Sequence, residues 1–170
     1  MSEAITVWIH IVAVAVWLGP QFFMFLVAMP AVRLIEDAGV RIRVMRAVIY
    51  RFGYVAWAAL GVIILTGVSN LFQEDDEASI DIFSSDYRYM LIFNVKMGLF
   101  VVMALLTVLH TFVVGPRQLR LHEELPAGSP EILRMRRVSV IISGSVLLLS
   151  IAIVYVAAVL ANHDYSFQPR

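Results

Sequence analysis

The stretch Ala4–Pro20, AITVWIHIVAVAVWLGP, contains no Asp, Glu, Lys or Arg, yet it holds a histidine with a tryptophan on either side. Uncharged residues then continue as far as Val32. A helix rises about 1.5 Å per residue, so about 20 residues cross the roughly 30 Å of hydrocarbon in a bilayer. The segment is therefore long enough to span a membrane, with an imidazole inside the span.

Three further segments repeat this pattern. Uncharged runs extend over residues 52–73 and 138–163, and a run over residues 89–116 is interrupted only by Lys96. The chain is 61% hydrophobic and 15% charged, whereas a soluble domain has about a quarter charged residues. We therefore predict an all-α integral membrane protein, a single domain over residues 1–170. Its four spans are expected at about residues 4–30, 50–72, 89–115 and 138–162.

The connections between these spans differ sharply in charge. The first and third connections are rich in arginine, whereas the second, Gln73–Arg88, holds six acidic residues and one arginine. By the positive-inside rule, the first and third connections face the cytoplasm. This predicts an up-down-up-down four-helix bundle with both termini outside, in the inner (cytoplasmic) membrane of a prokaryote. The arginines cluster at the ends of spans, a pattern that does not indicate nucleic-acid binding.

Two ionisable residues lie at similar depths in this arrangement. His10 is about five residues, or roughly 8 Å, below the outer end of the first span, and Lys96 is about seven residues, or roughly 10 Å, below that of the third. His110 lies about 14 residues beyond Lys96, or about 21 Å further along the helix. Because ionisable groups inside a membrane usually face the bundle interior or a polar cavity, we expect these side chains to point inward.

The helical period places other residues on the same faces. Residues spaced three or four apart share one side of a helix. The face of the first span holds Thr6, His10, Val14, Trp17 and Gln21, and that of the third holds Lys96, Met103, Thr107 and His110. Trp8 points to the opposite side and is expected to be an interfacial anchor. Small residues of the fourth span, Ser139, Ser143 and Ser150, should allow close helix packing.

Simpler roles compete with functional ones at several of these positions. Lys96 can snorkel to the outer interface, because helix side chains tilt toward the N-terminus. His110 can be an interfacial histidine bonded to a backbone carbonyl, and the default for His122 and His163 is solvation. The methionines are expected to be packing residues and not copper ligands. His10 is harder to explain by solvation and is the strongest candidate for a functional residue.

Short motifs connect the chain to known membrane families. HIVAVAVWLG, residues 10–19, resembles the first span of the family with HemJ-type protoporphyrinogen oxidases, where a histidine is followed by a tryptophan and then by a small residue or glycine. RFGYVAWAALGVIILTG, residues 51–67, and YRYMLIFNVKMGLFVVMALLTVLH, residues 87–110, resemble the copper-resistance D (CopD) family. The sequence GPQFFMFLVAMP after Trp17 replaces the Pro-Arg-Leu segment expected in HemJ, which weakens transfer of the oxidase activity.

The HemJ resemblance implies haem b as a cofactor, with His10 as the iron (metal) ligand and Lys96 as a functional partner. Lys96 would act as a propionate partner or, if neutral, as an iron ligand. Val14, Trp17 and Phe100 could wall the haem slot. A second axial ligand from His110 is disfavoured, because its level differs from that of His10 by roughly 20 Å.

Three functions follow from these observations. The first is a haem-b-binding redox protein that transfers electrons or, as an oxidoreductase, oxidises a hydrophobic reductant such as a quinol or a porphyrin-type compound. The second is a copper uptake or homeostasis protein of the CopD type, although the chain lacks the cysteine thiolates that Cu(I) prefers. The third is a non-catalytic structural subunit. The lipid bilayer is the expected environment, and assembly into a homo-oligomer is left open.

Overall fold

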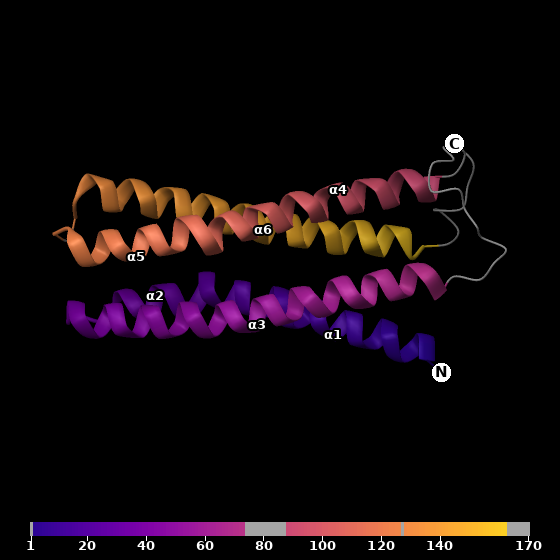
Figure 1. Ribbon diagram of the computed structural model, residues 1–170, viewed down its shortest axis with the longest axis horizontal. Helices are drawn as coiled ribbons and strands as arrows, with labels where there is room; N and C mark the ends of the chain where they lie inside the picture. The colour runs from indigo at the N-terminus through magenta and orange to yellow at the C-terminus, as the bar shows by residue number, and fades with distance from the viewer. Residues whose placement is uncertain (1, 74–87, 127, 163–170) are drawn as a thin grey trace. The chain divides into compact units, whose positions relative to one another are not determined.

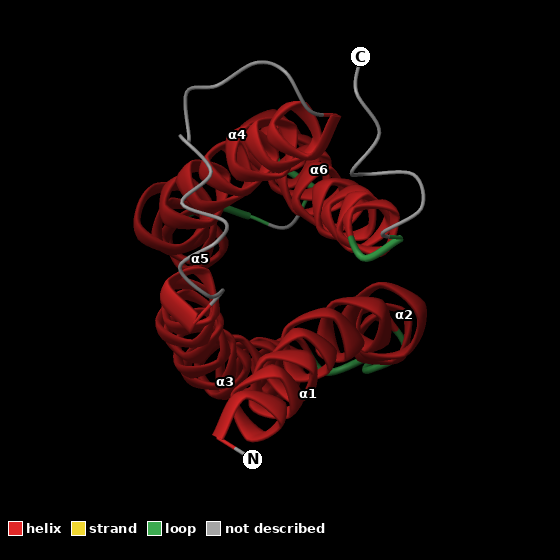
Figure 2. Cartoon of the chain, turned by 90° about the vertical axis from the view of Figure 1, so that its right-hand side faces the viewer, coloured by secondary structure: helices red, strands yellow, loops and turns green. Residues whose placement is uncertain are grey.

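The computed structural model describes residues 2–73, 88–126 and 128–162, and these residues form helices and short connections without a strand (Figures 1 and 2). Four helical segments are long and apolar enough to cross a membrane: Ala4–Arg33, Ala38–Asn70, Arg88–Glu124 and Pro130–Leu160. The predicted all-α fold with four membrane-spanning helices is confirmed. The acidic residues of the second connection, 74–86, and His163 lie outside the described residues.

The chain divides into two compact units, Met1–Ser79 and Ile80–Arg170. Each unit contains two long helical segments that lie side by side in both ribbon views (Figures 1 and 2). A single domain over residues 1–170, and the outside location of both termini, remain predictions.

The first unit begins with one long helical segment that changes geometry near its end. It consists of α1 (Ser2–Phe23), a π-helical turn η1 (Met24–Ala28) and α2 (Met29–Arg33). α1 continues through Pro20, and the departure from α geometry comes in η1, one turn later. The second segment is α3 (Ala38–Gln73), which runs antiparallel to the first.

The start of α3 is set by a helix cap and lies well before the predicted start near residue 50. Asp37 Oδ1 accepts a hydrogen bond of 2.7 Å from the Val40 N–H group, which satisfies one of the free donors at the helix start. No proline follows before the end of α3 at Gln73. The helix therefore extends through the arginine-rich region between the cap and the apolar run.

The second unit has the same order of elements. Its first segment consists of α4 (Arg88–Leu109), a π-helical turn η3 (His110–Val114) and α5 (Gly115–Glu124). α6 (Pro130–Leu160) follows after a short turn in which Gly128 has a φ of 92°, a conformation that favours glycine. Pro130 lies in the first turn of α6, where its missing N–H group costs nothing. α6 thus starts before residue 138, where the predicted span begins.

The two π-helical turns share a physical cause. In each, the residue after the turn, Met29 or Gly115, donates its N–H group to the carbonyl five residues earlier. The next residue is Pro30 in the first unit and Pro116 in the second. A proline lacks an N–H group, and its ring clashes with the carbonyl four residues before it. The wider π-turn gives that carbonyl room, so each long helix continues past its proline.

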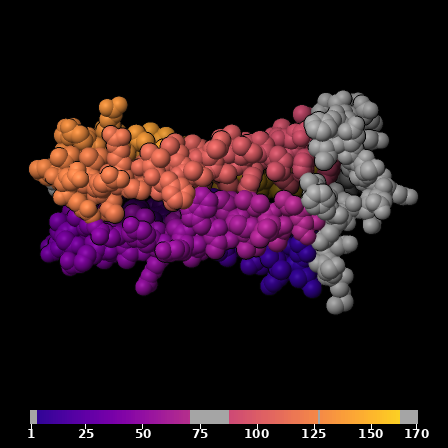
Figure 3. Space-filling model, viewed as in Figure 1, coloured from indigo at the N-terminus to yellow at the C-terminus, as the bar shows by residue number. Residues whose placement is uncertain are grey.

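The surfaces of the helices are largely apolar, as expected for helices in lipid. Trp8 is 64% exposed and Leu148 is 68% exposed, whereas Trp17 and Met103 are only 5% and 2% exposed. Trp8 thus faces away from the buried side of α1, as predicted. Figure 3 draws all atoms on one face of the molecule, and a few single side chains stand out from it. Such exposed apolar side chains support an integral membrane protein.

Candidate functional site

His10 of α1 forms a hydrogen bond with the neighbouring helix α3. Its Nδ1 atom lies 2.8 Å from Thr66 Oγ1. The Thr66 hydroxyl also lies 2.6 Å from the Val62 carbonyl oxygen, which can only accept a proton. A hydroxyl has one proton to donate, so Thr66 Oγ1 donates to Val62 and accepts from the Nδ1–H group of His10. This network assigns the proton of the neutral ring to Nδ1 and its lone pair to Nε2.

Gly67 brings the backbone of α3 close to the same ring. A Cβ atom at this position would lie 3.5 Å from His10 Cε1, at ordinary contact distance. Both residues of the Thr-Gly pair at the end of RFGYVAWAALGVIILTG therefore lie next to the His10 ring.

The other members of the predicted face of α1 are buried or half-buried. Trp17 is 5% exposed and Gln21 is 7% exposed, while Val14 is half-buried. The buried Gln21 amide donates through Nε2 to the Trp17 carbonyl oxygen at 3.1 Å, so it is satisfied within its own helix. The helical period therefore identified the buried face of α1, and the role of these residues in binding stays a prediction.

Lys96 of α4 contacts an aromatic ring on its own helix. Its Nζ atom lies 5.6 Å from the centroid of the Phe93 ring, within the range of a cation–π contact. The Phe93 ring in turn stacks on Tyr89, with centroids 6.3 Å apart and planes 8° apart. Both aromatic residues precede Lys96, so the lysine side chain runs toward the start of α4. This is the direction that snorkelling requires.

Met103 and Thr107 continue the predicted face of α4 and are 2% and 9% exposed. The Thr107 hydroxyl donates to the Met103 carbonyl at 2.9 Å. From α6, Ser150 Oγ lies 3.3 Å from Met103 Sδ and 2.8 Å from the Val146 carbonyl oxygen. These contacts fill the interface between the two long helices of the second unit, in agreement with a packing role for Met103.

His110 lies at the same helix–helix interface, in the π-turn η3. Its Nε2 atom is 3.1 Å from Ser139 Oγ and 3.0 Å from Ser143 Oγ, both on α6. The predicted alternative of a backbone-carbonyl partner is therefore wrong, and two serine hydroxyls take that place. The face of small residues on α6 was expected to allow close helix packing, and it also supplies hydrogen bonds.

His122 differs from the expectation of a loop residue. It lies on α5, and its Nδ1 atom is 2.8 Å from the Gln118 carbonyl oxygen of the preceding turn. The helical segment continues past Pro116 along α5 and includes this polar sequence. The charged residues next to His122 therefore belong to a helix and not to a loop.

The candidate residues are distributed over both units. His10, Val14 and Trp17 belong to the first, whereas Lys96, His110 and the half-buried Phe100 belong to the second. In the structure, His10 contacts Thr66 and Gly67. The expectation that His10 and Lys96 both point inward, toward a polar cavity, stays a prediction. Within residues 2–73, 88–126 and 128–162, no group of three or more His, Cys, Asp or Glu side chains could hold a metal ion.

One comparison with known proteins identifies a relationship. The family model CopD, described as copper resistance protein D, matches residues 46–160. The match covers most of α3 and all of α4, α5 and α6, and so includes Thr66, Lys96 and His110. It begins after α1, which places His10 outside it. No protein of curated function and no solved structure matches the chain.

Proposed function

This chain belongs to the CopD family, and from that premise we propose that it is a copper uptake or homeostasis protein of the membrane, with a copper ion as its substrate. The observation that carries the proposal is the family match, which extends over three of the four membrane-spanning segments. The copper alternative therefore has better support than the haem interpretation.

His10 is the residue we propose as the copper ligand inside the membrane. Imidazole nitrogen is a suitable ligand for copper. A histidine that binds a metal almost always donates its other ring N–H group to a neighbour, which orients the ring. His10 has this arrangement, because its Nδ1–H group is held by Thr66 and the lone pair is on Nε2.

The sequence next to this site supports the entry of a cation. α3 ends at Gln73, and the six acidic residues of the second connection follow directly, beginning with Glu74. Thr66 lies seven residues before the end of α3 at Gln73, a distance of about 10 Å along the helix axis. Clustered carboxylates raise the local concentration of cations. In the proposed function, copper is attracted by this connection and then meets His10.

Haem b, iron binding and electron transfer remain predictions that neither the family match nor the described residues support. A histidine with its lone pair on Nε2 suits iron as well as copper. The first experiment must therefore identify the bound metal. The protein is purified in detergent from cells grown with added copper, and its metal content and absorption spectrum are measured.

We expect bound copper and no haem absorption in the wild-type protein, and loss of most of that copper in His10→Ala. His122→Ala is the matched control, because this histidine bonds to its own helix on α5 and lies away from α1 in the sequence. It should keep the copper. A sharp Soret band with a reducible α-band would favour the haem function. A purified protein that contains neither copper nor haem would favour a non-catalytic structural subunit.

A further inference from the structure

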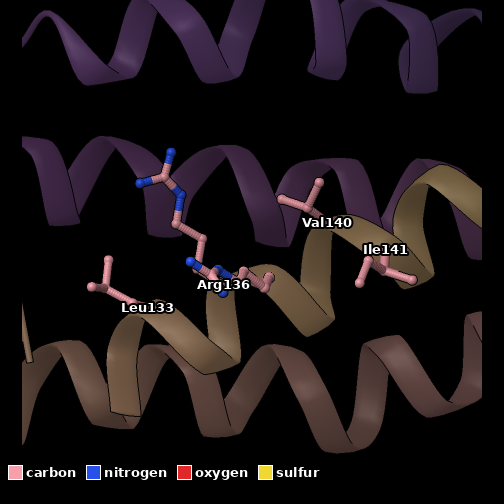
Figure 4. Close-up of a pocket in the computed structure, with 5 residues that line it drawn as sticks. Leu133, Arg136, Val140 and Ile141 are labelled. Carbon is pink, nitrogen blue, oxygen red and sulfur yellow. The ribbon is translucent and has the colours of Figure 1, made fainter. Parts of the chain in front are cut away.

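One face of α6 near its start forms a groove in which two arginines lie among apolar residues (Figure 4). The lining residues are Leu133, Arg136, Arg137, Val140 and Ile141. All five are exposed, and Ile141 is 67% exposed. The groove therefore combines cationic groups with uncovered apolar surface.

The order of these residues along α6 matches the layers of a bilayer. Arg136 and Arg137 are the last charged residues before the uncharged run of residues 138–163. Val140 and Ile141 follow one turn later, about 6 Å deeper along the helix axis. The arginines are thus expected at the headgroup level on the cytoplasmic side, with the two apolar side chains at the start of the hydrocarbon.

The two guanidinium groups carry positive charge that the described residues do not neutralise. Within residues 2–73, 88–126 and 128–162, no hydrogen bond or ion pair involves either arginine. The single acidic residue of α6 is Glu131, which lies about 130° away around the helix, on another side. The groove is therefore complementary to an anion.

We propose that this groove binds an anionic phospholipid from the cytoplasmic leaflet. Its phosphate lies between Arg136 and Arg137, and an acyl chain lies along Val140 and Ile141. The planar guanidinium group binds phosphate oxygens through two parallel hydrogen bonds, which Lys cannot do. A zwitterionic lipid would bring its ammonium group close to two cations, so a lipid with net negative charge is favoured.

The site is tested on the whole protein in neutral detergent by native mass spectrometry and thermal unfolding. Phosphatidylglycerol and phosphatidylcholine are the two probes. We expect phosphatidylglycerol to bind and to raise the melting temperature more than phosphatidylcholine does. In the double variant Arg136→Gln with Arg137→Gln, phosphatidylglycerol should bind about tenfold more weakly, because charge-assisted hydrogen bonds are lost.

Two controls separate this site from general surface charge. Arg117→Gln with Arg120→Gln removes the same charge from α5 and should leave phosphatidylglycerol binding close to the wild-type value. Arg136→Lys with Arg137→Lys keeps the charge without the bidentate geometry and should have intermediate affinity. Equal loss of binding in the α5 variant and the groove variant would overturn the proposal, since it would indicate a nonspecific effect of charge.

Two further measurements distinguish a phospholipid from free inorganic phosphate as the ligand of the groove. Val140→Ala with Ile141→Ala leaves the arginines in place and should weaken phosphatidylglycerol binding by removing apolar contact. Inorganic phosphate alone should raise the melting temperature much less than the lipid. If inorganic phosphate stabilises the wild-type protein as much as phosphatidylglycerol does, the groove is a simple anion site and the lipid assignment is wrong.

Discussion

At the scale of single residues, the two intramembrane histidines are held in different ways. The Nδ1 atom of His10 lies beside a hydroxyl whose proton is donated to a carbonyl, so Nδ1 acts as the donor in this pair. The Nε2 atom of His110 meets two serine hydroxyls, and each of these can donate or accept. A neutral His10 would therefore carry its lone pair on Nε2, whereas the contacts of His110 with two serines are compatible with either tautomer.

The contact between His10 and Thr66 leads to a prediction about copper affinity. Thr66→Val keeps the shape of the side chain but removes the acceptor of the Nδ1–H group. Loss of such a partner lowers metal affinity by about 10- to 100-fold, so we expect weaker copper binding in a competition assay with a chelator of known affinity.

Thr107→Val provides the control for this substitution. Its hydroxyl also donates to a carbonyl of its own helix, that of Met103 on α4. Copper binding in this variant should equal that of the wild-type protein. If Thr66→Val binds copper as tightly as Thr107→Val, Thr66 does not orient the ligand.

At the scale of the elements, the π-turn in the second unit depends on the close approach of two backbone segments. A Cβ atom at Gly115 would lie 3.2 Å from the His110 carbonyl oxygen, which is tighter than nearly all such contacts. That oxygen also accepts the N–H bond that closes η3. A Cβ atom at this position would therefore require the His110 carbonyl, a member of the π-turn, to shift by a few tenths of an ångström.

Two glycine substitutions test this constraint. Gly115→Ala should destabilise the protein by about 1–2 kcal/mol, because the crowding outweighs the gain in helix propensity. Gly98→Ala on α4 meets no atom within 4 Å and should leave the melting temperature unchanged or raise it. Thermal unfolding in detergent compares the two variants. Equal melting temperatures would mean that the π-turn adapts to a Cβ atom.

At the scale of the whole molecule, the distribution of arginine predicts how the chain crosses the membrane. The chain contains no cysteine, so single cysteines can report on each side. Ser79→Cys, in the acidic connection, should react with an impermeant maleimide in intact cells, and Ser129→Cys should react only after permeabilisation. Labelling of Ser129→Cys alone in intact cells would invert the topology and the depths assigned to His10 and Lys96.

The sequence predicted the membrane-spanning segments well and their ends less well. Long uncharged runs indicate spans because hydrocarbon excludes charge, but a helix continues into the headgroup layer where polar residues are tolerated. Its true ends depend on local features such as the Asp37 cap and Pro130. The π-turns also had a signal in the sequence, namely Pro30 and Pro116, which follow them directly.

The amino-acid sequence by itself determined that this chain is a four-span helical membrane protein and which faces of its helices are buried. Hydrophobicity and the helical period act along one helix, so Trp17 and Met103 could be placed without knowledge of any partner. The pairing of His10 with Thr66, and of His110 with two serines, was decided only by tertiary structure. Such pairs depend on the register of one helix against another, which arises from many side-chain contacts across their interface and has no periodic signal in either helix.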